Sequence, residues 1–175
     1  MLVLDWGAGI NPDIRATDAI DRSSGDNLQR KIAREVKDFN LTKDEAKKLK
    51  NKIKNVRYIW GINANETPLS YPSNSFDRVV SSGGINAWGN IFAYREVFRI
   101  LKPEGKIEVN HVDPVGHEII KKRLRIVGFG NFKTKTSANP RTIRDILFFR
   151  HFKPWQTTHL KSGSIMGTKP HIRRR

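Results

Sequence analysis

The chain has 175 residues, with 33 Lys and Arg against 17 Asp and Glu for a formal net charge of +16, and it contains no cysteine. This length supports one domain with a hydrophobic core and is short for two. The lack of cysteine excludes a disulfide scaffold, thiolate catalysis and Cys-ligated zinc. No apolar stretch approaches the roughly 18 residues of a membrane span, and no secretory signal pattern opens the chain. We therefore expect an intracellular, soluble protein of the cytoplasm.

The positive charge is concentrated in two parts of the chain. Residues 26–58 hold 11 basic against 5 acidic residues, and residues 117–175 hold 15 against 2. The remainder of the chain carries a net charge of −3. A mildly acidic body with two basic additions suits a polyanionic partner better than uniform basicity would.

Two short strands joined by a tight turn are expected at the start. Residues 2–5 form an apolar run followed by two glycines, which is typical of a buried parallel strand and its turn. Residues 14–18 are expected to form the second strand. Only residues 10–13 separate the two, and this gap is too short for a crossover helix.

A lysine-rich helical hairpin is expected next, as an insertion over residues 26–55. Apolar residues recur at helical spacing from Leu28 to Phe39, which predicts an amphipathic helix with a basic outer face. Thr42 and Glu45 then have the spacing of a capping box, which predicts the start of a second helix.

Strands and helices alternate over the rest of the chain. Strands are expected over residues 56–62, 76–81, 106–110 and 131–136, and helices over residues 91–101 and about 115–127. This alternation predicts an α/β fold with a doubly wound, mostly parallel sheet, in which ligands bind at the carboxyl ends of the strands. We expect one domain over residues 1–139, followed by a basic, aromatic extension over residues 140–175.

Three motifs, in this order, carry a family resemblance. They are Leu-Val-Leu-Asp-Trp-Gly-Ala-Gly at residues 2–9, a segment at 65–80 that contains Asn-Ser-Phe-Asp, and a segment at 94–109 that contains Leu-Lys-Pro-Glu-Gly. With them, residues 1–136 closely resemble class I S-adenosylmethionine-dependent methyltransferases of the small type 11 kind. The resemblance implies a compact, Rossmann-like methyltransferase fold and an enzyme that uses S-adenosyl-L-methionine as cofactor.

The resemblance also implies which residues bind the cofactor. Asp5 and the two glycines after it match the motif that receives the methionine part. Asp18 matches the acid that binds the ribose hydroxyls, because a carboxylate can accept two hydrogen bonds from a vicinal diol, and Asp21 is a nearby alternative. Asn65 falls where the family commonly contacts the adenine amine. The complete expected set is Asp5, Gly7, Gly9, Asp18, Asn65, Glu66, Ser81 and Ser82.

The expected catalytic residues are His111 and Asp113, at the carboxyl end of the strand over residues 106–110. Methyl transfer needs mainly in-line positioning, and a base is needed only for a weak nucleophile. The histidines show no metal-ligand spacing, so no metal site is expected. Members of the family usually have one or two helices before the first strand that cover the cofactor, and a partner chain is one way in which such a cover would be supplied here.

The basic segments suggest contact with nucleic acid. Phosphate-neutralising charge is interleaved with flat side chains that can stack on bases, and RNA is favoured over duplex DNA because stacking needs unpaired bases. An anionic membrane surface or an acidic protein assembly would attract the same charges. The candidate contacts are Lys47, Lys50, Lys54, Lys121, Lys122, Arg123, Arg125, Arg144, Arg150, Trp155, Arg173, Arg174 and Arg175.

Two functions follow from these observations. The first is a methyltransferase that acts on a nucleic acid held by the basic hairpin and extension. The second is a methyltransferase-like domain without catalysis that serves as a nucleic-acid-binding or structural component of a nucleoprotein assembly. Retention of the motif at residues 5–9 and of Asp18 favours the first function, and the reduced start of the domain favours the second.

Overall fold

The computed structural model describes residues 1–9, 12–22, 28–38, 40–64, 66–82, 85, 90–112, 114–136 and 163–171. In chain order the elements are β1 Val3–Trp6, β2 Asp18–Asp21, α1 Leu28–Asp38, α2 Lys43–Lys54, β3 Arg57–Trp60, β4 Phe76–Ser81, α3 Ile91–Ile100, β5 Leu101–Val112, α4 Pro114–Val127, β6 Gly130–Thr136 and β7 Gly163–Thr168.

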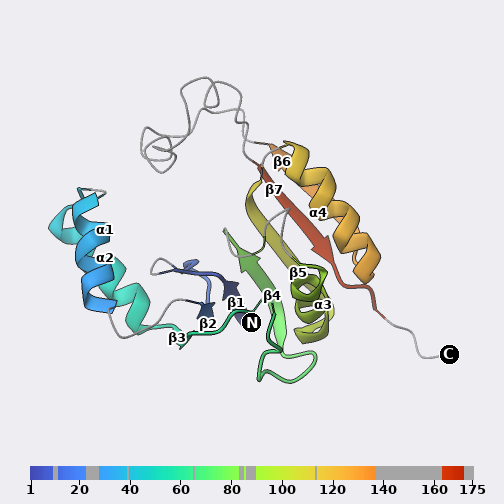
Figure 1. Ribbon diagram of the computed structural model, residues 1–175, viewed down its shortest axis with the longest axis horizontal. Helices are drawn as coiled ribbons and strands as arrows, with labels where there is room; N and C mark the ends of the chain where they lie inside the picture. The colour runs from blue at the N-terminus through green and yellow to red at the C-terminus, as the bar shows by residue number, and fades with distance from the viewer. Residues whose placement is uncertain are drawn as a thin grey trace.

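One seven-stranded sheet organises the fold, with strand order β3-β2-β1-β4-β5-β7-β6. The five strands from β3 to β5 are parallel to their neighbours, and β7 is antiparallel to both β5 and β6. Figure 1 shows this sheet with α3 and α4 beside the β5 and β7 half. The predicted fold class, an α/β fold with a mostly parallel sheet, is confirmed.

The main core lies between one face of the sheet and the helices α3 and α4. In β5 the buried Ile107 and Val109 alternate with Lys106 and Glu108 on the other face, whereas Val3, Ala19 and Val80 are buried on that other face in β1, β2 and β4. The sheet supplies Leu4, Trp6, Val79, Ile107 and Val109, all 2% exposed or less. The helices supply Tyr94, Val97, Ile100, Ile120 and Leu124, which are fully buried.

The hairpin of α1 and α2 has a small apolar cluster of its own. Ile32 from α1 packs with Leu49 and Ile53 from α2, and Tyr58 of β3 packs against them. The capping box is confirmed, because the Thr42 hydroxyl accepts a hydrogen bond from the Glu45 N–H while the Glu45 carboxylate accepts one from the Thr42 N–H. In Figure 1 the hairpin projects beyond β3, away from α3 and α4.

The second strand begins later than the sequence pattern predicts. Residues 14–17 belong to a turn, in which the Ala16 N–H donates to the carbonyl of Asp13 and Arg15 pairs with the Asp13 carboxylate. Thr17 then fixes the entry into β2, because its N–H donates to the Val3 carbonyl and its hydroxyl accepts from the Val3 N–H. The expected strand over residues 14–18 is therefore wrong, whereas the close parallel pairing of β1 with β2 agrees with the expectation.

The expected boundary near residue 139 does not separate all later residues from the domain. β7 lies inside the sheet between β5 and β6, and its Ile165 is fully buried in the main core. Directly after it, Lys169 is 6% exposed and its Nζ donates to the carbonyls of Phe98 and Leu101 at the end of α3. These residues belong to the fold, and residues 137–162 and 172–175 lie outside the described part of the chain.

Candidate functional site

A loop with two left-handed glycines follows the carboxyl end of β1 and contacts the carboxyl end of β2. Gly7 has φ 75° and Gly9 has φ 57°, values that glycine adopts without the steric cost of a Cβ atom. The N–H groups of Gly7 and Ala8 both donate to the carbonyl of Ile20 in β2. The Gly9 N–H donates to Oδ2 of Asp21 at 2.8 Å, which closes the loop onto the end of β2.

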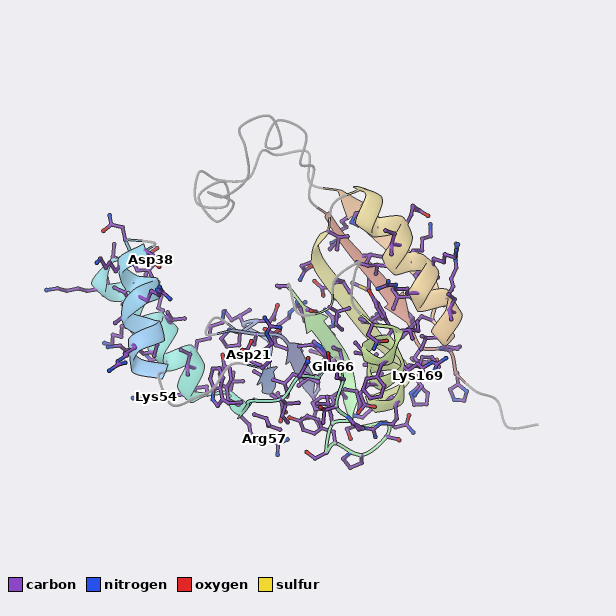
Figure 2. The ribbon with its side chains drawn as sticks, in the orientation of Figure 1. Asp21, Asp38, Lys54, Arg57, Glu66 and Lys169 are labelled. Atoms are coloured by element: carbon purple, nitrogen blue, oxygen red, sulfur yellow. The ribbon has the colours of Figure 1, made fainter. Side chains whose placement is uncertain are left out.

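Asp21, and not Asp18, is the acid at the carboxyl end of β2. Asp18 is the first residue of the strand and lies at its amino end. Its buried carboxylate accepts hydrogen bonds from Arg57, from the Tyr71 hydroxyl at 3.2 Å and from the Thr17 hydroxyl at 3.0 Å. Figure 2 shows the labelled side chains of Asp21 and Arg57 apart, at different ends of this part of the sheet. The expectation that Asp18 ends the second strand is therefore wrong, because β2 starts four residues later than predicted.

Asp5 is a buried carboxyl group at the base of the glycine loop. It is 2% exposed, and its Oδ2 accepts a hydrogen bond from the Asp13 N–H at 2.6 Å. Its Oδ1 is buried without a hydrogen-bond partner among the described residues. Burial raises the pKa of Asp5 from its ordinary 3.8 to about 6, and nearby Lys52 of α2 opposes this shift. Lys52 therefore lies close enough to the loop for its charge to act on Asp5.

Tyr58 and Trp60 in β3 form an aromatic pair beside this loop that the sequence reasoning did not single out. Their rings stack with centroids 4.4 Å apart and planes 4° from parallel. Trp60 is paired in register with Asp21, and Tyr58 with Ala19. The sequence pattern that predicts this pair is two aromatic residues at alternate positions of a short strand, because alternate positions lie on one face of the sheet.

Ser81 is held inside the sheet, and Ser82 and Glu66 are exposed. The Ser81 hydroxyl donates to the Trp6 carbonyl at 2.9 Å and accepts from the Ile85 N–H at 2.8 Å, so it joins β1 to β4. Ser82 directly follows β4, at the same edge as the glycine loop, and Glu66 lies in the connection after β3. Asn65 and Asp113 lie outside the described residues. The backbone of His111 belongs to β5, and its side chain is outside the described set.

The expected nucleic-acid contacts fall on separate elements. Lys47, Lys50 and Lys54 are exposed on α2, in the hairpin that projects beyond β3 (Figure 1). The basic residues of α4 lie on the side of the main core. There Lys121 pairs with Glu118, Arg123 lies over the Tyr94 ring and Arg125 lies over the Phe132 ring. The remaining candidates, which are Arg144, Arg150, Trp155, Arg173, Arg174 and Arg175, lie outside the described residues.

The edge at β1 and β2 fits a nucleoside with a charged amino-acid tail. Asp21 presents a carboxylate suited to a ribose diol, and Trp60 offers a flat surface next to it. A Cβ built on Gly9 would meet no atom within 4 Å, so the loop leaves space on that side. Oδ1 of Asp5, which has no hydrogen-bond partner among the described residues, supplies one further acceptor at the base of the loop. These donors, acceptors and the open glycine are chemically suited to S-adenosylmethionine.

Within the described part of the chain, none of the helices has the length and apolarity required to cross a membrane. The same residues contain no cluster of three or more His, Cys, Asp or Glu side chains arranged to hold a metal ion.

Residues 24–109 match the family model of a methyltransferase domain of type 11. A search of curated protein sequences finds no match. The fold is similar to a Thermotoga maritima protein described as a SAM-dependent methyltransferase and possible histamine N-methyltransferase. That likeness has a TM-score of 0.57 and 16% identity over 96% of this chain and 81% of the other.

Two further solved structures show the range of proteins that share this fold. Phosphoethanolamine N-methyltransferase 2 of Haemonchus contortus, solved with S-adenosyl-L-methionine, has a TM-score of 0.60 at 16% identity. The likeness covers 98% of this chain and 49% of that protein, so this chain spans about half its length. The [4+2]-cyclase SpnF has a TM-score of 0.59 at 18% identity, over 97% of this chain and 75% of the cyclase.

Proposed function

We propose that this chain, a class I S-adenosylmethionine-dependent methyltransferase by its domain family and fold, methylates an RNA held by its basic helical hairpin. The observation that carries the cofactor assignment is the contact between the Gly9 N–H and the Asp21 carboxylate at 2.8 Å. It places a left-handed glycine loop and an acid together at the carboxyl edge of the sheet, where ligands of doubly wound folds bind.

The bound cofactor supplies a methyl group already activated on a sulfonium, so the work of the protein is mainly orientation. Asp21 would hold the ribose hydroxyls, and Trp60 would pack against the adenine. The loop at Gly7 and Gly9 would accommodate the methionine part, with Asp5 beneath it. His111 stays a candidate base at the end of β5, for an acceptor that must lose a proton.

The substrate assignment is supported by the position of the hairpin. Lys47, Lys50 and Lys54 are exposed on α2, and Lys52 of the same helix is near Asp5 and Asp13 beside the glycine loop. At about 100° per residue, Lys47, Lys50 and Lys54 share the side of α2 opposite Lys52, so a polyanion bound by them would lie on the outer side of the hairpin whose inner side is near the glycine loop. Single-stranded RNA fits this arrangement because its bases are unpaired. A base can turn away from the strand while lysines hold the phosphate backbone.

Calorimetry with S-adenosylmethionine tests the cofactor assignment. We expect binding to the full chain that is weakened by Asp21→Ala and retained by Asp18→Ala at a temperature where both variants are folded. Absence of binding at millimolar cofactor would refute the proposal that this chain is an active methyltransferase. If RNA were nevertheless bound, that result would favour the alternative function, a non-catalytic nucleic-acid-binding component.

Methyl transfer to RNA tests the substrate. A mixed RNA pool incubated with methyl-labelled cofactor should acquire label that depends on Asp21. Replacing Lys47, Lys50 and Lys54 together by Gln should raise the RNA concentration needed for half-maximal rate without altering cofactor affinity. Labelling of small amines and not of RNA would contradict the substrate assignment and leave the cofactor assignment in place.

A further inference from the structure

The sheet face opposite α3 and α4 carries a second basic surface. Residues that pair directly across neighbouring strands share a face, and one such row runs through Tyr58, Ala19, Asp5, Val80, Glu108, Met166 and Lys133. The row begins at the aromatic pair in β3, passes Asp5 at the glycine loop and ends on the edge strand β6. Asp5 and Lys133 are four strand spacings apart, about 19 Å.

On this face Val80 of β4 is buried, and the part over β5, β7 and β6 is mainly polar. Lys106, Lys133 and Lys135 are exposed, and Ser164 and Thr168 are partly exposed between them. No helix of the described residues packs on this part, whereas α4 contacts β6 and β7 from the other side. An antiparallel region of a sheet with one polar face is stable against water and needs no apolar cover.

Cations outnumber acids on this surface. Arg15 from the turn before β2 and Arg78 of β4 share the Glu108 carboxylate, each at 3.2 Å, and Arg15 also pairs with Asp13. Lys106 lies directly opposite Arg78 in the pairing of β4 with β5. Glu108 and Asp13 compensate part of this charge, and Arg15, Arg78 and Lys106 together still outnumber these two acids.

We propose that this surface, defined as Arg15, Arg78, Lys106, Lys133 and Lys135, binds the phosphate backbone of a single-stranded RNA substrate. The proposal rests on the proposed function and identifies where the substrate continues beyond the hairpin. The hairpin packs on the same side through Tyr58, and the charge of Lys52 acts on Asp5 there. An RNA strand bound on this face can therefore continue past the glycine loop toward the hairpin without passing around an edge of the sheet.

The same geometry argues against the basic residues of α4 as part of that path. They lie on the opposite side of the sheet, and Arg123 and Arg125 are placed over aromatic rings. The charge on α4 nevertheless provides a control, because the partly exposed Lys121 and the exposed Lys122 and Arg125 can be replaced with the same loss of charge as three lysines of the proposed surface.

The test compares two triple variants of the full chain. One carries Lys106→Gln, Lys133→Gln and Lys135→Gln, and the control carries Lys121→Gln, Lys122→Gln and Arg125→Gln. Affinity for a single-stranded RNA oligonucleotide of mixed sequence is measured over a series of salt concentrations. Each phosphate contact contributes about 0.7 to the slope of log affinity against log salt, so the first variant should lower the slope by about 2 and the control should leave it unchanged.

An equal decrease in both variants would overturn the proposal, because it would show attraction by net charge alone. An unchanged slope in the first triple variant would also overturn the proposal. So would a first variant that loses binding to phosphatidylserine vesicles and keeps its affinity for RNA. Calorimetry with S-adenosylmethionine distinguishes failure of this proposal from failure of the proposed methyltransferase function. A wild-type chain that binds no cofactor refutes the enzyme, while the difference in slope between the variants still decides whether RNA crosses this face.

Discussion

The carboxylate of Asp5 accepts a hydrogen bond from the backbone N–H of Asp13 at 2.6 Å, and this contact holds the connection between β1 and β2 against the sheet. The contact uses one oxygen of a group that is 2% exposed, and the other oxygen has no partner among the described residues. A carboxylate in this position accepts the hydrogen bond of a backbone N–H and also carries a charge that burial disfavours.

Asp5→Asn is expected to stabilise the cofactor-free protein near pH 7. The folded protein holds the Asp5 proton with a pKa of about 6, against 3.8 ordinarily, so wild-type stability falls as the pH rises from about 4 through 6. The full effect is roughly 3 kcal/mol at most, and Asn keeps the oxygen that accepts from Asp13. Thermal unfolding should show that the variant is more stable than the wild type at pH 8 and that the two proteins differ little in stability at pH 4. A variant that is less stable at pH 8 would contradict this reading of the buried charge.

Substitution of Asp18 should mainly change the stability of the fold, and substitution of Asp21 should mainly change the affinity for the cofactor. Asp18→Ala removes the acceptor shared by Arg57, Tyr71 and Thr17 and should lower the free energy of unfolding by about 2 kcal/mol. Asp21→Ala should cost less stability and reduce cofactor affinity at least about tenfold, because charge-assisted hydrogen bonds are lost. Denaturant unfolding and calorimetry on the same two variants check both effects. The reverse pattern would restore Asp18 as the ribose acid.

Tyr58→Phe is expected to leave the hairpin packed and to raise stability by about 1 kcal/mol. The Tyr58 hydroxyl is buried without a hydrogen-bond partner among the described residues, and burial is the main reason that its pKa is raised. Its ring contacts the cluster of Ile32, Leu49 and Ile53, and Phe keeps that contact. Denaturant unfolding of Tyr58→Phe beside Tyr58→Ala measures the two contributions, and only the second variant should be destabilised. A less stable Phe variant would mean that the hydroxyl is satisfied in solution.

Lys169→Met should destabilise the fold by about 1–3 kcal/mol although it removes a buried charge. The Lys169 ammonium donates to Asn74 and to two carbonyls at the end of α3, and it lies 4.7 Å from the centre of the Phe98 ring. Met fills the same volume and leaves those acceptors unpaired. Lys122→Met on the exposed face of α4 is the matched control and should change stability by less than about 0.5 kcal/mol. Equal effects would show that Lys169 is dispensable.

Local patterns in the sequence predict most of the elements. The capping box at Thr42 and the helical spacing in α1 and α3 depend on residues a few positions apart, and these expectations agree with the structure. The start of β2 depends instead on Thr17 binding Val3, a contact between two strands that no local pattern contains. The wrong expectation that Asp18 ends the second strand follows directly from that shift.

The basic C-terminal part contains a strand that its composition does not predict. Its charge predicts one continuous extension, yet β7 has small and apolar residues that fit between two strands distant in sequence. Lys169 adds to the same count of charge and is a buried structural residue. Truncation after residue 139 is therefore unsuitable as a test of RNA binding, because it would remove a central strand together with the charge.

The position of β7 sets an order of events during synthesis. β6 pairs with β7 and with no other described strand, and β7 follows it by more than twenty residues in the chain. The five parallel strands and α3 can assemble from residues 1–112, but β6 has no partner until residues 163–168 have been made. A nascent chain stopped between these strands would expose an unpaired edge at β5, which is the kind of edge that chaperones protect and that aggregates recruit. Folding of this sheet is therefore completed by its last strand, in an inner position.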